Sequence, residues 1–87
     1  MQKFSYTVKD SSGIHARPAA MMTNCCCKFS SEVVISVGER VADGKDVLAV
    51  MSLYAKQGEE VQICINGSDE IETMHQLQEV LRSIEQL

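Results

Sequence analysis

Regular alternation of apolar and polar residues is the feature that most constrains how this 87-residue chain folds. In residues 2–9, 32–37 and 60–66, every second side chain is apolar, as with Val61 and Ile63. This period places the apolar side chains on one face of an extended strand and the polar ones on the other. Strands of this kind are typical of an antiparallel sheet that is covered on one face only.

Other segments repeat their apolar residues at helical spacing. Residues 16–28 contain no glycine, and Pro18 falls in the first turn, where a missing amide breaks no helical hydrogen bond. Helices are also predicted for residues 46–53 and for the segment after Asp69. Asp46 is the first residue of one segment and Asp69 precedes the other, and both are natural N-caps.

The order of these segments predicts the fold class. A further short strand is expected around Arg40–Ala42, which gives the order βαββαβα within one domain, residues 1–87. Helices that pack on the single covered face of a sheet produce a two-layer arrangement. We therefore predict an α+β fold, with a four-stranded antiparallel sheet and three helices on one face.

Charge and hydropathy exclude some classes of function. The net charge of −4 argues against a nucleic-acid partner. Residues 1–58 carry seven basic and five acidic residues, whereas residues 59–87 carry one basic and seven acidic residues. No apolar run is long enough to span a bilayer, and the N-terminus has no secretory signal pattern. We expect a cytoplasmic protein without direct membrane contact.

The four cysteines do not form a metal-binding pattern. Cys25, Cys26 and Cys27 are consecutive, so on a helix their thiols point in different directions, and Cys64 is distant in sequence. We expect reduced thiols that behave as small apolar side chains, and no metal site. A redox role for residues 25–27 remains an alternative.

His15 is the candidate site for chemistry. It lies between a turn containing Gly13 and a predicted helix, where unpaired amides and the helix dipole favour an anion. The backbone amides of Ala16 and Arg17 would meet a phosphoryl group on the ring, and the Arg17 guanidinium would bind its oxygens. Imidazole is a nucleophile near neutral pH. From these residues alone, a static anion site or a structural hydrogen bond remains equally open.

The surrounding residues resemble a known family. The stretch Gly13-Ile14-His15-Ala16-Arg17-Pro18-Ala19 is similar to the active-centre signature of HPr, the histidine-containing phosphocarrier of the bacterial phosphotransferase system. Similarity extends along essentially the whole chain, including Val50-Met51-Ser52-Leu53 and Lys56-Gln57-Gly58. The resemblance implies an open-faced β-sandwich, in agreement with the pattern of strands and helices.

The resemblance also implies a mechanism. Enzyme I, charged from phosphoenolpyruvate, would pass a phosphoryl group to Nδ1 of His15, and the chain would pass it to the IIA domain of a sugar permease. Arg17 would contact the phosphoryl group. Such a protein is a stoichiometric carrier rather than an enzyme, needs no cofactor, and is expected to be a monomer.

Partners of this family dock on an exposed apolar surface beside the active histidine. A short helix cannot bury all its apolar residues against one sheet, so we expect Leu48 and Met51 to be exposed. The positions that the resemblance assigns to docking are Ala20, Asn24, Cys27, Val47, Leu48 and Met51.

Asp46 departs from many members of the family, which carry a regulatory serine here. It has no hydroxyl to phosphorylate, and it is either a plain N-cap or a mimic of phosphoserine. An engineered substitution is a further alternative. Mimicry would favour a regulatory binding module that docks a catabolite-control transcription factor. A carrier in a specialised or nitrogen-related branch is another open alternative.

Overall fold

The computed structural model describes residues 1–85, and its seven elements follow the predicted order. The predicted strand 2–9 and helix 16–28 each extend two residues beyond the observed elements. The elements are β1 (Gln2–Thr7), α1 (Ala16–Cys26), β2 (Glu32–Val37), β3 (Arg40–Asp43), α2 (Val47–Ser52), β4 (Glu60–Asn66) and α3 (Glu70–Ile84).

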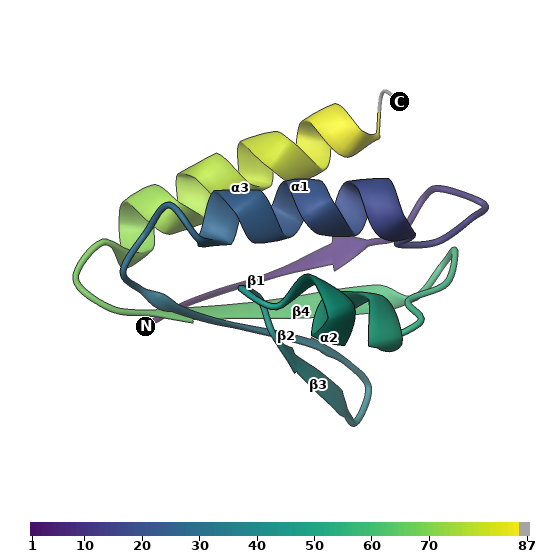
Figure 1. The fold of residues 1–87 in the computed structure, drawn as a ribbon, viewed down its shortest axis with the longest axis horizontal. Helices are drawn as coiled ribbons and strands as arrows, with labels where there is room; N and C mark the ends of the chain where they lie inside the picture. The colour runs from purple at the N-terminus through teal and green to yellow at the C-terminus, as the bar shows by residue number, and fades with distance from the viewer. Residues whose placement is uncertain (86–87) are drawn as a thin grey trace.

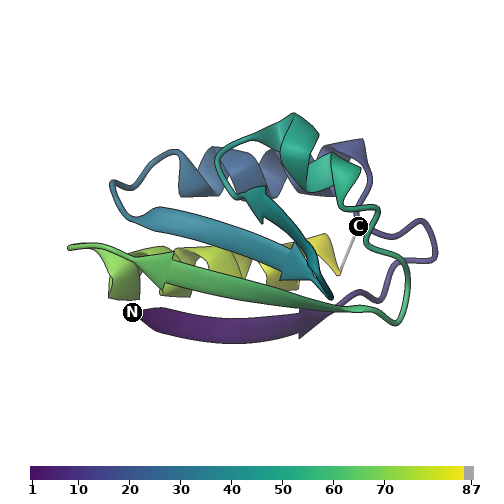
Figure 2. The same cartoon turned by 90° about the horizontal axis from the view of Figure 1, so that it is seen from below.

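The four strands form one antiparallel sheet in the order β1-β4-β2-β3. Its register aligns Phe4, Ile63 and Ile35 across three strands, so that alternate side chains share one face. The helices lie on one side of this sheet, with α1 beside α3 and α2 near β3 (Figure 1). The view from below shows the other face uncovered (Figure 2). The predicted α+β fold class is confirmed.

The core lies between the sheet and the helices. The inward residues of β2 and β4 are almost completely buried, whereas Phe4 and Tyr6 on the edge strand β1 are half-buried. From the helical side, Met22 and Leu77 are fully buried. The sheet contributes Val33, Ile35, Val37, Val61, Ile63 and Ile65.

Asp69 does not play the predicted role of side-chain cap. It occupies the N-cap position of α3, but its carboxylate accepts hydrogen bonds from the backbone amides and hydroxyls of Ser30 and Ser31. The two serine amides are each 2.9 Å from Asp69. Bonds from Ser31 and Ser30 hold the pKa of Asp69 well below its usual range. The carboxylate thus joins the loop before β2 to the start of α3.

The cysteines behave largely as small apolar residues. Cys25 and Cys26 are buried, Cys27 is exposed and Cys64 is half-buried, and all four are free thiols. Burial raises the pKa of Cys26 to about 12. Within residues 1–85, no helix is both long and apolar enough to cross a membrane.

Candidate functional site

Backbone contacts fix the turn that carries His15. Gly13 has a φ of +68°, and a Cβ there would lie 2.1 Å from the carbonyl oxygen of Ala55. The next amide, of Ile14, donates to the same Ala55 oxygen over 2.9 Å. Only glycine tolerates both this conformation and this approach. The turn is therefore held against the segment that follows α2, and this contact sets the position of His15.

His15 is the N-cap residue of α1. Its carbonyl oxygen accepts the amide of Ala19 over 3.0 Å, but its side chain makes no capping bond. The imidazole is 45% exposed. The amides of Ala16 and Arg17 have no acceptor among the described residues. The ring, two free amides and the helix dipole are thus assembled as the sequence predicted, in a geometry suited to an anion.

Arg17 lies in the first turn of α1, and its side chain is exposed. Within residues 1–85 it forms no ion pair or side-chain hydrogen bond. Its guanidinium is therefore available to a phosphoryl group or to an acidic partner. Pro18, which follows, is buried and supplies no amide.

Asp10 is a residue of the site that the sequence did not reveal. Its Oδ2 lies 3.4 Å from Nε2 of His15. Its Oδ1 accepts the amide of Ser12 over 2.8 Å, and its carbonyl oxygen accepts the amide of Gly13 over 2.9 Å. The bond from Ser12, followed by that from His15, lowers the pKa of Asp10. The sequence signal that could have indicated this role is an Asp two residues before a Ser in a glycine-containing turn.

A hollow of about 270 Å³ opens beside the imidazole. Tyr54 and Lys56, which follow α2, contribute to its wall together with Met51. The backbone of Tyr54 has a φ of +50°, a conformation that usually favours glycine. Its side chain is 73% exposed. No local pattern around Tyr54 predicts this conformation. The complete lining is Ser12, Ile14, His15, Ala16, Met51, Tyr54, Ala55 and Lys56.

The predicted docking positions lie on or at the end of two adjacent helices. On α2, Leu48 is 71% exposed, Met51 and Val47 are half-buried, and Val50 and Leu53 face the core. The expected exposure of Leu48 is thus observed in full, and that of Met51 in part. At the end of α1, the Cys27 thiol donates to the carbonyl oxygen of Lys45 over 3.6 Å, while Ala20 is half-buried and Asn24 is exposed.

Asp46 has the geometry of an N-cap. Its Oδ1 accepts the amide of Leu48 over 3.1 Å and that of Ala49 over 3.2 Å. Two of the unpaired amides at the start of α2 are satisfied in this way. The capping half of the Asp46 hypothesis is confirmed, and mimicry of phosphoserine remains a prediction.

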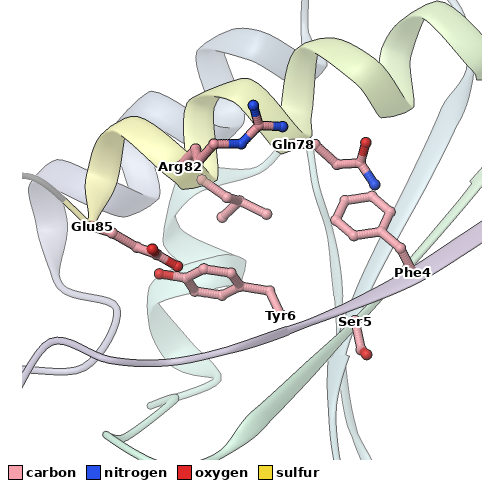
Figure 3. A pocket seen from close by; sticks show the side chains of 7 residues that line it. Phe4, Ser5, Tyr6, Gln78, Arg82 and Glu85 are labelled. Atoms are coloured by element: carbon pink, nitrogen blue, oxygen red, sulfur yellow. The ribbon is translucent and has the colours of Figure 1, made fainter.

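A second hollow lies between β1 and α3, and His15 is not among the residues that line it (Figure 3). Phe4 and Tyr6 form one side and Gln78, Arg82 and Glu85 the other. The hydroxyl of Tyr6 points towards Glu85 (Figure 3). Burial, followed by the charge of Glu85, raises the pKa of Tyr6. The wall contains no histidine or cysteine, so the candidate nucleophile belongs to the first hollow.

Comparison with known proteins decides the family. A family model described as the phosphorylation site of the HPr component of the phosphotransferase system matches residues 2–83. The chain belongs to the HPr family. The predicted resemblance is therefore confirmed over nearly the whole length, and phosphate carriage within the phosphotransferase system is the role of this family.

Solved structures of HPr proteins have the same fold. A histidine-containing phosphocarrier protein from mycoplasma shares 30% identity over 95% of this chain and 94% of its own, with a TM-score of 0.93. HPr from Thermoanaerobacter tengcongensis shares 31% identity over 95% and 93% of the two chains, with a TM-score of 0.88. Crh, the catabolite repression protein of Bacillus subtilis, shares 28% identity over 95% of each chain, with a TM-score of 0.73.

Proposed function

We propose that this chain accepts a phosphoryl group on Nδ1 of His15 from enzyme I and passes it to IIA domains of sugar permeases. The observation that supports the proposal is the arrangement at the start of α1. There an exposed imidazole adjoins two amides that lack acceptors, and the unpaired guanidinium of Arg17 lies in the same turn. The chain that carries this arrangement belongs to the HPr family.

Each part of this arrangement has a role in the transfer. Nδ1 of His15 attacks phosphorus in line with the bond to the donor, which breaks as the new bond forms. The negative charge on the three phosphoryl oxygens faces the amides of Ala16 and Arg17 and the Arg17 guanidinium. The reverse displacement delivers the group to the next histidine. Positioning and charge promote each step. The chain itself holds the phosphoryl group between the two steps, so it acts as a stoichiometric carrier rather than an enzyme.

The docking surface supplies the second part of the proposal. Met51 lines the hollow beside His15, and Leu48 is exposed on the same helix. We assign Asn24 and Cys27, which are both exposed, to the rim of this surface. An apolar centre within a polar rim is typical of protein interfaces. We place the exchange in the cytoplasm, where the monomeric carrier meets enzyme I and IIA domains in turn.

Labelling with enzyme I tests the transfer. The wild-type chain should acquire acid-labile phosphate from labelled phosphoenolpyruvate, and His15→Ala should acquire none. His75→Ala is the matched control, because His75 is also exposed but lies on α3. Arg17→Ala should slow loading by about 10- to 100-fold, the worth of a charge-assisted hydrogen bond. An unlabelled wild type, or a label that persists in His15→Ala, would contradict the proposal.

Replacing an exposed apolar residue tests the docking surface. Leu48→Glu should raise the KM for enzyme I about tenfold, as expected for a contact at the centre of an interface. Its kcat should change little, because the imidazole is untouched. Ile71→Glu is the control, since Ile71 is also an exposed apolar helical residue, 56% accessible, but on α3. Equal KM values for the two variants would remove Leu48 from the interface.

A further inference from the structure

We propose that Asp10 is a positioning residue for this transfer. Its carboxylate keeps the ring proton of His15 on Nε2, and so leaves the lone pair on Nδ1 to receive the phosphoryl group. The inference rests on the proposed function of His15 and adds the device that selects between its two ring nitrogens.

The turn orients the carboxylate of Asp10 independently of the histidine. One oxygen is occupied by the amide of Ser12, and the backbone carbonyl of Asp10 is occupied by the amide of Gly13. The remaining oxygen, Oδ2, faces Nε2 of His15 at 3.4 Å. Nδ1 of His15 makes no hydrogen bond within residues 1–85.

An ionised carboxylate only accepts hydrogen bonds, so the nitrogen that faces it carries the proton. Hydrogen bonding lowers the pKa of Asp10, which keeps this carboxylate ionised at neutral pH. In a neutral imidazole, a proton on Nε2 leaves the lone pair on Nδ1. The contact therefore favours the tautomer that Nδ1 chemistry requires.

The same contact acts during the transfer. The Nδ1 lone pair forms the bond to phosphorus, and the electrons of the donor bond leave with the donor. The ring then carries a positive charge with its proton still on Nε2, and this charge faces Asp10. On transfer to the next acceptor, the bonding pair returns to Nδ1. A buried aspartate orients and stabilises a catalytic histidine by this logic in hydrolytic triads.

The basic residues near the contact between Asp10 and His15 do not form ion pairs with Asp10 among the described residues. Lys9, next to Asp10 in the chain, pairs with Glu85 at 3.5 Å. Arg17 forms no ion pair among the described residues. Among those residues, the carboxylate paired with His15 is that of Asp10.

The chain contains a matched control for Asp10. Asp43 builds the same kind of turn, because its Oδ1 accepts the amide of Lys45 over 2.9 Å and its carbonyl oxygen accepts the amide of Asp46 over 3.0 Å. No histidine is bonded to it in the described chain. Asp43→Asn therefore removes one charge from an equivalent turn without affecting the imidazole.

The tautomer of His15 gives the first test, by ¹⁵N NMR of the imidazole in the unphosphorylated protein at a pH where the ring is neutral. Wild type should have its proton mainly on Nε2. Asp10→Asn retains an acceptor for Ser12 but presents no carboxylate to the ring, so the ratio of Nδ1–H to Nε2–H should rise about two- to fivefold, the range of an exposed pair. Asp43→Asn should not change it.

Phosphoramidate gives the second test without enzyme I. Nδ1 or Nε2 attacks its phosphorus, the P–N bond of the reagent breaks, and ammonia leaves with the bonding pair. The ³¹P spectrum then separates the two phosphohistidines. Wild type and Asp43→Asn should be loaded mainly on Nδ1, and Asp10→Asn should show a larger share on Nε2.

Two results would overturn the role of Asp10. One is a majority of Nδ1–H in the wild type, which needs no variant and therefore holds even if Asp10→Asn fails to fold. The other is the same nitrogen ratio in Asp10→Asn and Asp43→Asn. Failure of the proposed function looks different, because the wild type would then react with phosphoramidate but not with enzyme I.

Discussion

The two ends of the molecule use an aspartate before a helix in opposite ways. At one end, Asp69 accepts bonds from the amides and hydroxyls of Ser30 and Ser31, and Ser31 is completely buried. At the other end, Asp10 accepts one backbone amide and faces the exposed ring of His15. An aspartate thus joins two segments of the fold at one end, whereas at the other end an aspartate contacts a side chain that stays accessible to solvent.

The backbone is equally tight at both ends. A Cβ on Gly67 would lie 2.6 Å from Cα of Ser31, and one on Gly13 would lie 2.1 Å from the oxygen of Ala55. At the His15 end, the backbone is therefore closely packed, and only the side chains are exposed. A rigid backbone that presents free side chains is the arrangement that pre-organises a reactive group.

Asp69→Ala should produce the largest loss of stability. The amide and hydroxyl of buried Ser31 would lose their acceptor, and an unsatisfied buried group costs about 1–3 kcal/mol. The free energy of unfolding, measured with urea, should fall by several times more than in Asp43→Ala, whose carboxylate bonds one exposed amide. Similar losses in the two variants would show that the Asp69 contacts do not hold this end together.

Gly13→Ala should affect both stability and loading. Positive φ and the overlap with Ala55 together should cost about 1–3 kcal/mol, and the displaced turn should slow phosphorylation of His15. Gly38→Ala is the control, because Gly38 has a φ of +60° but nothing within 4 Å of the added carbon. Equal losses in both variants would mean that the close approach at Gly13 contributes nothing.

Asp46→Ala should have a smaller effect, about 1 kcal/mol, because α2 loses its side-chain cap. Asp46→Asn retains an acceptor and should stay within about 0.5 kcal/mol of the wild type. If Asp46 is a plain cap, loading by enzyme I should be equal in Asp46→Asn and the wild type. Faster loading of the asparagine variant would instead support mimicry of phosphoserine.

The smallest expected effect is a difference in the pH at which the Asp10 and Asp69 ends respond to acid. A carboxylate whose pKa is lower in the folded state stabilises the fold above its unfolded pKa of about 4, and this contribution is lost as pH falls through the folded pKa. The pKa of Asp10 is lowered, but that of Asp69 is held much further down. In an NMR titration, the amide of Ser12 should therefore respond at higher pH than those of Ser30 and Ser31. The reverse order would contradict the comparison.

Local patterns in the sequence account for much of the fold. Alternation predicted the three longer strands, because this signal repeats within a few residues. The exposure of Leu48 was expected because a short helix cannot bury all its apolar residues against one sheet. The position of His15 at a helix start was also readable. The partners of Asp69 and the contact between Asp10 and His15 were not, since they depend on how distant or tightly turned segments meet. The left-handed conformation of Tyr54 contradicts its own local preference.

The position of β4 has a consequence for how the chain folds. This strand is synthesised after the other three, yet it lies between β1 and β2. The β2–β3 hairpin can form locally, whereas β1 has no partner until β4 appears, and closing so long a loop slows folding. Val8, which leads into the His15 turn, also bonds residues 58 and 59 just before β4. During synthesis, the reactive turn therefore cannot form its contacts with residues 55–59 until that segment, next to β4, has left the ribosome.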